Sequence, residues 1–162
     1  MLNPIRVGTS IRLFSREKNS KKIRGLCHDD EMIKVITGVR RCGKFCLMRC
    51  IAEELRAEGV DNEQIVFLDL DRYGYRSIKA QEQFEALTEP LLYTPGTKYL
   101  LIDEVQNVEG FEDVLNGFRA EGGFSIFIIG SNSNLLSGEL VMKLAVRYIE
   151  FEMQMLDFVE YR

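Results

Sequence analysis

The sequence predicts an α/β protein: a three-layer sandwich with a mostly parallel five-stranded sheet and helices on both faces. Short apolar runs alternate along the chain with longer amphipathic runs, the pattern of repeated strand–helix units. Two of the apolar runs, Tyr99–Ile102 and Phe124–Ile129, lack in-and-out alternation, as expected for parallel strands buried on both faces. The 162 residues suffice for about one domain with its own core.

The individual elements follow from the same patterns. Strands are predicted at Ile33–Ile36, Ile65–Leu70, Tyr99–Ile102, Phe124–Ile129 and Arg147–Met153. Helices are predicted at Gly43–Glu58, Ser77–Leu92, Val108–Ala120 and Asn134–Leu144, with the opening of another at Leu156–Tyr161. In the first helix Leu47, Ile51 and Leu55 recur every four residues and so share one face. Gly59 is a natural stop for that helix, and Ser77 is a candidate N-cap for the next.

The charge is distributed unevenly. Residues 1–24 hold seven Lys or Arg and one Glu, a net of +6, and the remainder carries −10, which gives −4 overall. We expect a basic N-terminal arm over residues 1–32, a single core over 33–155, and the start of a truncated C-terminal region over 156–162. The arm is interpreted as a solvated helix, with contact to a nucleic acid or protein partner, or a targeting leader, as alternatives.

Composition excludes several classes of protein. With 46% hydrophobic residues the chain does not have the profile of a disordered protein. No apolar run approaches the roughly 20 residues that span a bilayer. Four Cys in a chain of this length do not make a disulfide scaffold. We therefore expect free thiols, a cytoplasmic location and no membrane partner.

The first predicted strand is followed by a phosphate-binding pattern. The segment Gly38-Val39-Arg40-Arg41-Cys42-Gly43-Lys44-Phe45 matches G-x-x-x-x-G-K-[ST] at every fixed position except the last. Glycines let successive backbone N–H groups point at phosphate oxygens, and the following helix adds its positive N-terminus. We expect these eight residues to bind a nucleotide, with Lys44 on its β- and γ-phosphates. The alternative is a glycine-rich turn without a ligand.

Two acids follow the third predicted strand, Asp103 and Glu104. Ligands of parallel sheets bind at the carboxyl ends of the strands, so these side chains are expected near the phosphate loop. Asp103 is the predicted Mg²⁺ ligand, and Glu104 is the predicted base that polarises the attacking water. The alternative is a pair of exposed loop acids.

Two further candidates lie near the fourth and fifth strands. Asn132, within Gly130–Ser133, could hydrogen-bond the γ-phosphate or the water, although this segment could equally supply only a helix N-cap. Arg147 is a candidate arginine finger, acting in cis or from a neighbouring subunit, or an ordinary strand-end Arg.

The cysteines Cys42, Cys46 and Cys50 are spaced four residues apart, with Cys27 and His28 earlier in the chain. This is not a usual zinc spacing, so packing as small apolar side chains is favoured over metal or redox chemistry.

Together these motifs resemble a family of prokaryotic AAA-type ATPases, usually described only as ATP-binding or AAA-domain proteins, that normally carry a further C-terminal domain. The resemblance rests on Ile33–Lys44, Tyr99–Gln106, Gly130–Leu140 and Arg147–Phe151, and covers most of residues 16–161. It implies a P-loop NTPase core of the additional-strand type that uses ATP and Mg²⁺. It also implies Lys44 on phosphate, with Asp103 on Mg²⁺ and Glu104 as the base. Asn132 takes the sensor position and Arg147 the family's arginine position.

The sequence departs from the family at three places. Phe45 replaces the Ser or Thr, Ala145-Val146 replace Ser-Gly, and Met155-Leu156 replace Pro-Leu. Phe45 offers no oxygen to Mg²⁺, and its ring must either turn into the helix–sheet interface or crowd the metal position. We therefore expect a Mg²⁺-dependent ATPase impaired by Phe45, working alone or as a homo-oligomer. The alternative is a degenerate nucleotide-binding or partner-binding module without turnover.

Overall fold

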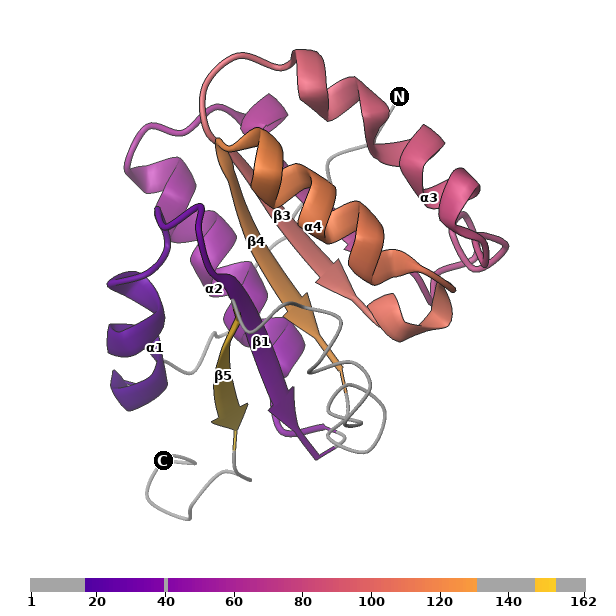
Figure 1. Ribbon diagram of the computed structural model, residues 1–162. Helices are drawn as coiled ribbons and strands as arrows, with labels where there is room; N and C mark the ends of the chain where they lie inside the picture. Colours follow the sequence, from indigo (N-terminus) through magenta and orange to yellow (C-terminus); the bar gives the residue numbers. More distant parts are fainter. Residues whose placement is uncertain (1–16, 40, 131–147, 154–162) are drawn as a thin grey trace.

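The computed structural model of the chain describes residues 17–39, 41–130 and 148–153. Its α-helices are α1 (Glu17–Arg24), α2 (Lys44–Ala57), α3 (Gln81–Thr88) and α4 (Phe111–Glu121) (Figure 1). Its strands are β1 (Ile33–Gly38), β2 (Ile65–Asp69), β3 (Lys98–Asp103), β4 (Phe124–Ile129) and β5 (Tyr148–Met153). Short 3₁₀ turns η1 (Asn62–Gln64), η2 (Glu89–Tyr93) and η3 (Val105–Asn107) lie between them. No helix in this part of the chain is both long and apolar enough to cross a membrane.

The five strands form one sheet in the order β2-β3-β4-β1-β5, and every neighbouring pair is parallel. The predicted five-stranded α/β architecture is therefore confirmed. All six residues of β4 are buried, as the continuous apolar run predicts. Strand β4 lies between β1 and β3, so the two strands that carry the candidate motifs are separated by one strand and end at the same edge.

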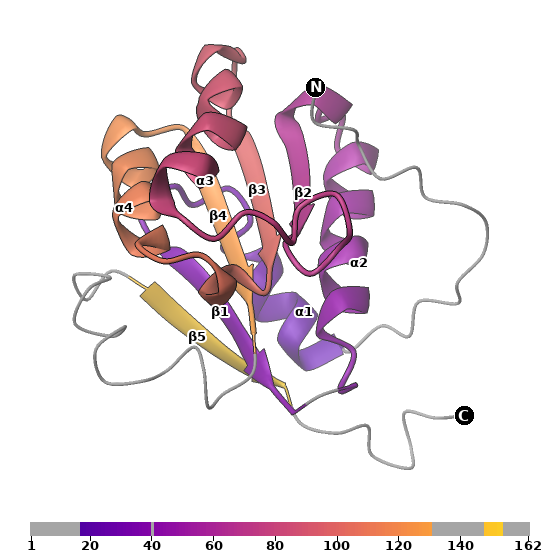
Figure 2. The ribbon, with the colours of Figure 1, turned by 90° about the vertical axis from the view of Figure 1, so that its right-hand side faces the viewer.

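Helices cover both faces of the sheet, with α1 and α2 on one side and α3 and α4 on the other (Figure 2). Each layer has its own apolar core. On the α2 side Met48, Ile51 and Leu55 pack with sheet residues, and on the other side Phe84 and Leu115 do the same. The four-residue spacing that predicts α2 therefore marks the face that the sheet covers.

Some predicted boundaries are wrong for local reasons. Helix α3 begins at Gln81, and Ser77 lies in an exposed turn before it. The side-chain oxygen of Gln83 accepts hydrogen bonds from the backbone N–H groups of Lys79 and Ala80, at 2.8 and 3.1 Å, and so fixes the chain directly before the helix without a serine cap. The helices predicted at 134–144 and 156–161 lie outside the described residues.

Hydrogen bonds of a buried lysine hold the segment between α1 and β1 against the sheet. The Nζ atom of Lys34 donates to Ser125 Oγ at 2.9 Å and to the backbone oxygen of Asp29. In turn Ser125 Oγ donates to the backbone oxygen of Cys27 at 2.6 Å. Lys34 is fully buried, and this burial lowers its pKa to about 8. The described part of the predicted N-terminal arm is thus packed against the core from Ile23 onward.

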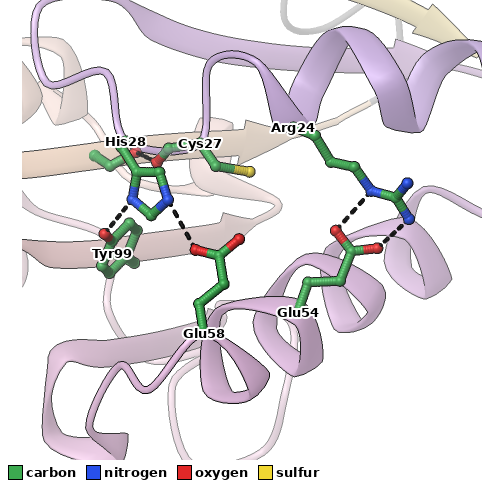
Figure 3. Close-up of polar contacts among 7 residues, drawn as sticks. Arg24, Cys27, His28, Glu54, Glu58 and Tyr99 are labelled. Atoms are coloured by element: carbon green, nitrogen blue, oxygen red, sulfur yellow. Dashed lines mark hydrogen bonds and ion pairs between the residues drawn. The ribbon is translucent and has the colours of Figure 1, made fainter.

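Polar side chains extend this attachment to α2 (Figure 3). The guanidinium of Arg24 donates through Nε to Glu54 at 2.8 Å, and a second bond makes the pair bidentate. His28 hydrogen-bonds the Tyr99 hydroxyl at 2.6 Å through Nδ1 and the Glu58 carboxylate at 2.8 Å through Nε2. These contacts join α1, α2 and the start of β3, at the end of the sheet away from the phosphate loop.

Replacing Lys34 by Met is expected to change how stability depends on pH. The pKa of Lys34 is about 8 in the folded chain against an ordinary 10.5, so the unfolded chain binds the proton more strongly. Between about pH 8 and 10 the free energy of unfolding should therefore rise with pH more steeply in the unmodified chain than in Lys34→Met. Urea denaturation at several pH values in this range measures the free energy of unfolding of both proteins. The same pH dependence in the two proteins would contradict the prediction.

Candidate nucleotide-binding site

The phosphate loop runs from the end of β1 into α2 and depends on a close backbone contact at Gly38. A Cβ atom there would lie 2.5 Å from the backbone oxygen of Met153 and 2.7 Å from Cys42 Sγ, so no larger residue fits. Gly43, directly before α2, has φ +89°, a conformation that glycine adopts without strain. The two glycines of the motif are therefore required by the shape of the loop.

Lys44 places a positive charge at the start of α2. Its Nζ atom donates to the backbone oxygens of Gly38 at 2.8 Å and Val39 at 2.9 Å, and lies 3.6 Å from Cys42 Sγ. The lysine thus folds over the loop, where phosphate oxygens could replace these carbonyls as its acceptors. Together with the N-terminus of α2, this arrangement fits an anion such as a nucleotide phosphate.

The ring of Phe45 lies between α2 and the sheet. It packs edge-on against Phe67 of β2, with ring centroids 5.2 Å apart and planes at 67°, and the Arg49 guanidinium lies 6.0 Å from it. Of the two expected positions for this ring, the contact with Phe67 matches the helix–sheet interface, where the ring lies half-buried at the edge strand β2. The loop therefore offers no side-chain hydroxyl at the position where the motif normally supplies a Mg²⁺ ligand.

Carboxylates gather at the ends of β2 and β3. Asp103 pairs with Asp69 across these strands, and Glu104 follows directly. Burial, reinforced by the charges of Glu104 and Asp69, raises the pKa of Asp103 from 3.8 to about 6. Lys44 acts in the opposite direction on this pKa, so the loop lysine and Asp103 are close enough to interact.

This edge would favour a divalent cation electrostatically, but it is not a complete metal cage. Within the described ranges no three His, Cys, Asp or Glu side chains are arranged to hold a metal ion. A Mg²⁺ ion at Asp103 would therefore take most of its oxygen ligands from phosphates and water, as this ion commonly does.

Glu104 is held in an uncommon conformation. Its φ of +57° lies in the left-handed region, which is costly for a residue other than glycine and is frequent at functional sites. Its backbone N–H donates to the oxygen of Ile129 in β4 at 3.2 Å, and its carboxylate accepts a hydrogen bond from Gln106 Nε2. The side chain that the sequence predicts as the base is thus oriented by a partner two residues later.

Sequence reasoning missed two members of this group, Asp69 and Gln106. Asp69 lies inside the predicted strand and becomes a neighbour of Asp103 only through the register of β2 and β3. Asn132, Arg147 and Arg40 lie outside the described residues. All four cysteines are free, with Cys27 and Cys42 buried, as the packing interpretation predicts for them, but Cys46 exposed.

Replacing Asp103 by Asn is expected to stabilise the ligand-free protein at pH 7. The raised pKa means that the folded chain binds this proton more strongly than the unfolded chain, so ionisation costs stability above about pH 6. A shift of this size corresponds to about 1–3 kcal/mol. The gain should shrink as the pH falls from about 6 to 4 in denaturant titrations. A destabilised Asn variant at pH 7 would contradict this account.

Comparisons with known proteins agree with the geometry. The model of an AAA domain family matches residues 30–162. An uncharacterized protein of Haemophilus influenzae is 39% identical over 134 residues, covering 82% of this chain and 34% of the relative. One from Methanocaldococcus jannaschii is 28% identical over 166 residues, covering 99% of this chain and 34% of the relative. The chain thus spans about a third of the length of these relatives.

Solved structures share the fold at low sequence identity. Saccharomyces cerevisiae RIF2 superposes with a TM-score of 0.60 at 16% identity, over 92% of this chain and 60% of that one. A DNA replication initiation factor gives 0.58 at 18% identity, over 88% and 46%. Caenorhabditis elegans PCH-2 gives 0.56 at 18% identity, over 86% and 40%. The chain belongs to the AAA domain family, and its core is a nucleotide-binding, P-loop ATPase-like α/β domain.

Proposed function

We propose that this core binds ATP and, with Mg²⁺, hydrolyses it slowly to ADP and phosphate. The observation that supports this most directly is the position of Lys44, which folds over the loop between β1 and α2, one strand away from Asp103 at the end of β3. Transfer of a phosphoryl group to water needs a cation beside the phosphates and an acid that holds the metal ion. The sheet brings both to the edge where its strands end.

Each residue has a distinct part in the proposed reaction. The loop N–H groups and Lys44 bind the β- and γ-phosphates, and Asp103 would hold Mg²⁺, which supplies positive charge beside them. Glu104 accepts the proton of the attacking water as its oxygen bonds to the γ-phosphorus, and ADP leaves with the β–γ bridging oxygen. Asn132 would hydrogen-bond the γ-phosphate or water, and Arg147 would neutralise charge in cis or from a second subunit.

A second candidate function is a nucleotide-binding or partner-binding module without turnover. Phe45 is the residue that favours it, because its ring is packed against Phe67 and contributes no oxygen. Loss of one hydroxyl ligand weakens Mg²⁺ binding more than phosphate binding, since the latter depends mainly on the backbone and Lys44. The two functions differ in phosphate release and not in ATP binding.

Replacing Lys44 by Ala should weaken ATP binding by about 10-fold or more, because a charge-assisted hydrogen bond contributes roughly 1.5–3 kcal/mol. Calorimetric titration of the full chain measures the change. The matched control is Lys79→Ala, which removes an exposed lysine from the turn before α3. Equal affinities for the unmodified chain and Lys44→Ala would exclude the loop as the nucleotide site.

Glu104→Gln should lower the rate of phosphate release by at least about 100-fold while ATP affinity stays within a few-fold, since a general base acts in the transition state. Single-turnover release with saturating ATP separates the two quantities. If ATP affinity falls by as much as the rate of phosphate release, Glu104 supports the structure of the site and does not act as the base.

Phe45→Ser should raise Mg²⁺-dependent ATP affinity and phosphate release, because it returns a hydroxyl ligand to the start of α2. Phe45→Ala is the matched control, since it removes the same ring without adding the oxygen. The measurement is phosphate release and ATP binding across a Mg²⁺ titration for all three proteins. If Ser and Ala variants behave alike, or the unmodified chain already turns over briskly with Mg²⁺, the assigned effect of Phe45 is wrong.

A further inference from the structure

A groove of about 550 Å³ is lined by residues of α3, η2 and α4. Helices α3 and α4 lie on the face of the sheet opposite α1 and α2 (Figure 2). None of the groove's lining residues belongs to the phosphate loop or to the acids at the strand ends. Apolar side chains contribute to its surface, with Val114 and Phe118 nearly buried and Leu92 43% exposed. The groove is therefore a surface feature separate from the nucleotide site.

Acidic residues dominate the rest of this groove. Five carboxylates line it: Glu82, Glu85, Glu89, Asp113 and Glu121. Its described lining contains no Lys or Arg, and none of the five acids forms an ion pair with another described residue. Five like charges around an apolar strip repel one another, and a cationic partner with apolar side chains would relieve this repulsion while covering Leu92.

The same chain contains a segment of that chemistry. Residues 1–16 include Arg6, Arg12 and Arg16 and no acid. The same sixteen residues also contain Ile5, Val7, Ile11, Leu13 and Phe14. Basic and apolar residues are thus interleaved in the segment, matching the acids and apolar strip of the groove in both charge and hydrophobic character.

We propose that the groove between α3 and α4 binds residues 1–16 of a second copy of this chain. The second copy is favoured because α1, which directly follows this segment, lies on the opposite face of the sheet. To reach the groove of its own chain, the segment would have to pass around the edge of the sheet, whereas the groove of a second copy does not require this. The contact joins different surfaces on the two copies, so two copies that exchange segments reciprocally close as a dimer, whereas a head-to-tail arrangement extends to rings or filaments.

Sedimentation of the full chain tests the contact. At about 50 mM salt, where surface charges are weakly screened, the unmodified chain should associate as its concentration rises, and about 500 mM salt should dissociate it. Glu85→Lys/Glu121→Lys, with one reversal on each helix, should stay monomeric. The control Glu31→Lys/Glu63→Lys makes the same charge change at exposed acids away from the groove and should associate normally. A chain that is monomeric at every concentration, or a control that also fails to associate, would overturn the proposal.

Mixing two defective variants identifies the surfaces. Arg6→Glu/Arg12→Glu reverses the segment but keeps the groove, and Glu85→Lys/Glu121→Lys keeps the segment but reverses the groove. Neither variant should associate alone. A mixture should form heterodimers, because the unmodified segment of one variant can bind the unmodified groove of the other. A labelled peptide of residues 1–16 should bind the segment variant at least about 10-fold more tightly than it binds a chain carrying all four reversals. No heterodimer in the mixture, or equal peptide binding, would show that these surfaces do not pair.

Discussion

Parallel pairing of all five strands is the constraint on which the site depends. It brings every carboxyl end to one edge of the sheet, and placing β4 between β1 and β3 sets the phosphate loop and the acids one strand apart. The same pairing seats β5 against β1 so closely that Gly38 cannot carry a side chain. Separate apolar cores cover the two faces of the sheet, and this packing supports the strand ends that carry the phosphate loop and the acids.

Several residues of the candidate site have conformations or surroundings that cost folding free energy. Asp103 is partly buried beside two other acids, and Glu104 has a left-handed backbone conformation. Among the described residues, Lys44 hydrogen-bonds backbone oxygens and a thiol. The buried pair Lys34 and Ser125, at the other end of the sheet, is by contrast well matched by hydrogen bonds. Local conflict of this kind is typical of a functional site, where residues serve the binding of a ligand at some cost in stability.

Much of this arrangement could be predicted from the sequence, and the failures have physical reasons. Continuous apolar runs marked the inner strands β3 and β4, which are buried on both faces, whereas the edge strand β5 alternates between buried and exposed residues. The glycines and Lys44 marked the loop because its shape admits few residues. Asp69 and Gln106 escaped notice because their roles depend on strand register and on the turn at Glu104. The position of the Phe45 ring could not be chosen from the sequence either, since Phe67, on a different strand, decides it.

We propose that Lys44 and the backbone N–H groups of the loop bind the nucleotide phosphates, largely without help from a metal ion. The most direct test of this proposal is calorimetric binding of ATP, ADP and AMP to the full chain in EDTA and again with excess Mg²⁺. The account predicts that ATP and ADP bind at least about 10-fold more tightly than AMP in EDTA, since Lys44 meets only the outer phosphates. It also predicts that Mg²⁺ changes the ATP affinity by no more than a few-fold. Equal affinities for AMP and ATP, or ATP binding that appears only with Mg²⁺, would contradict it.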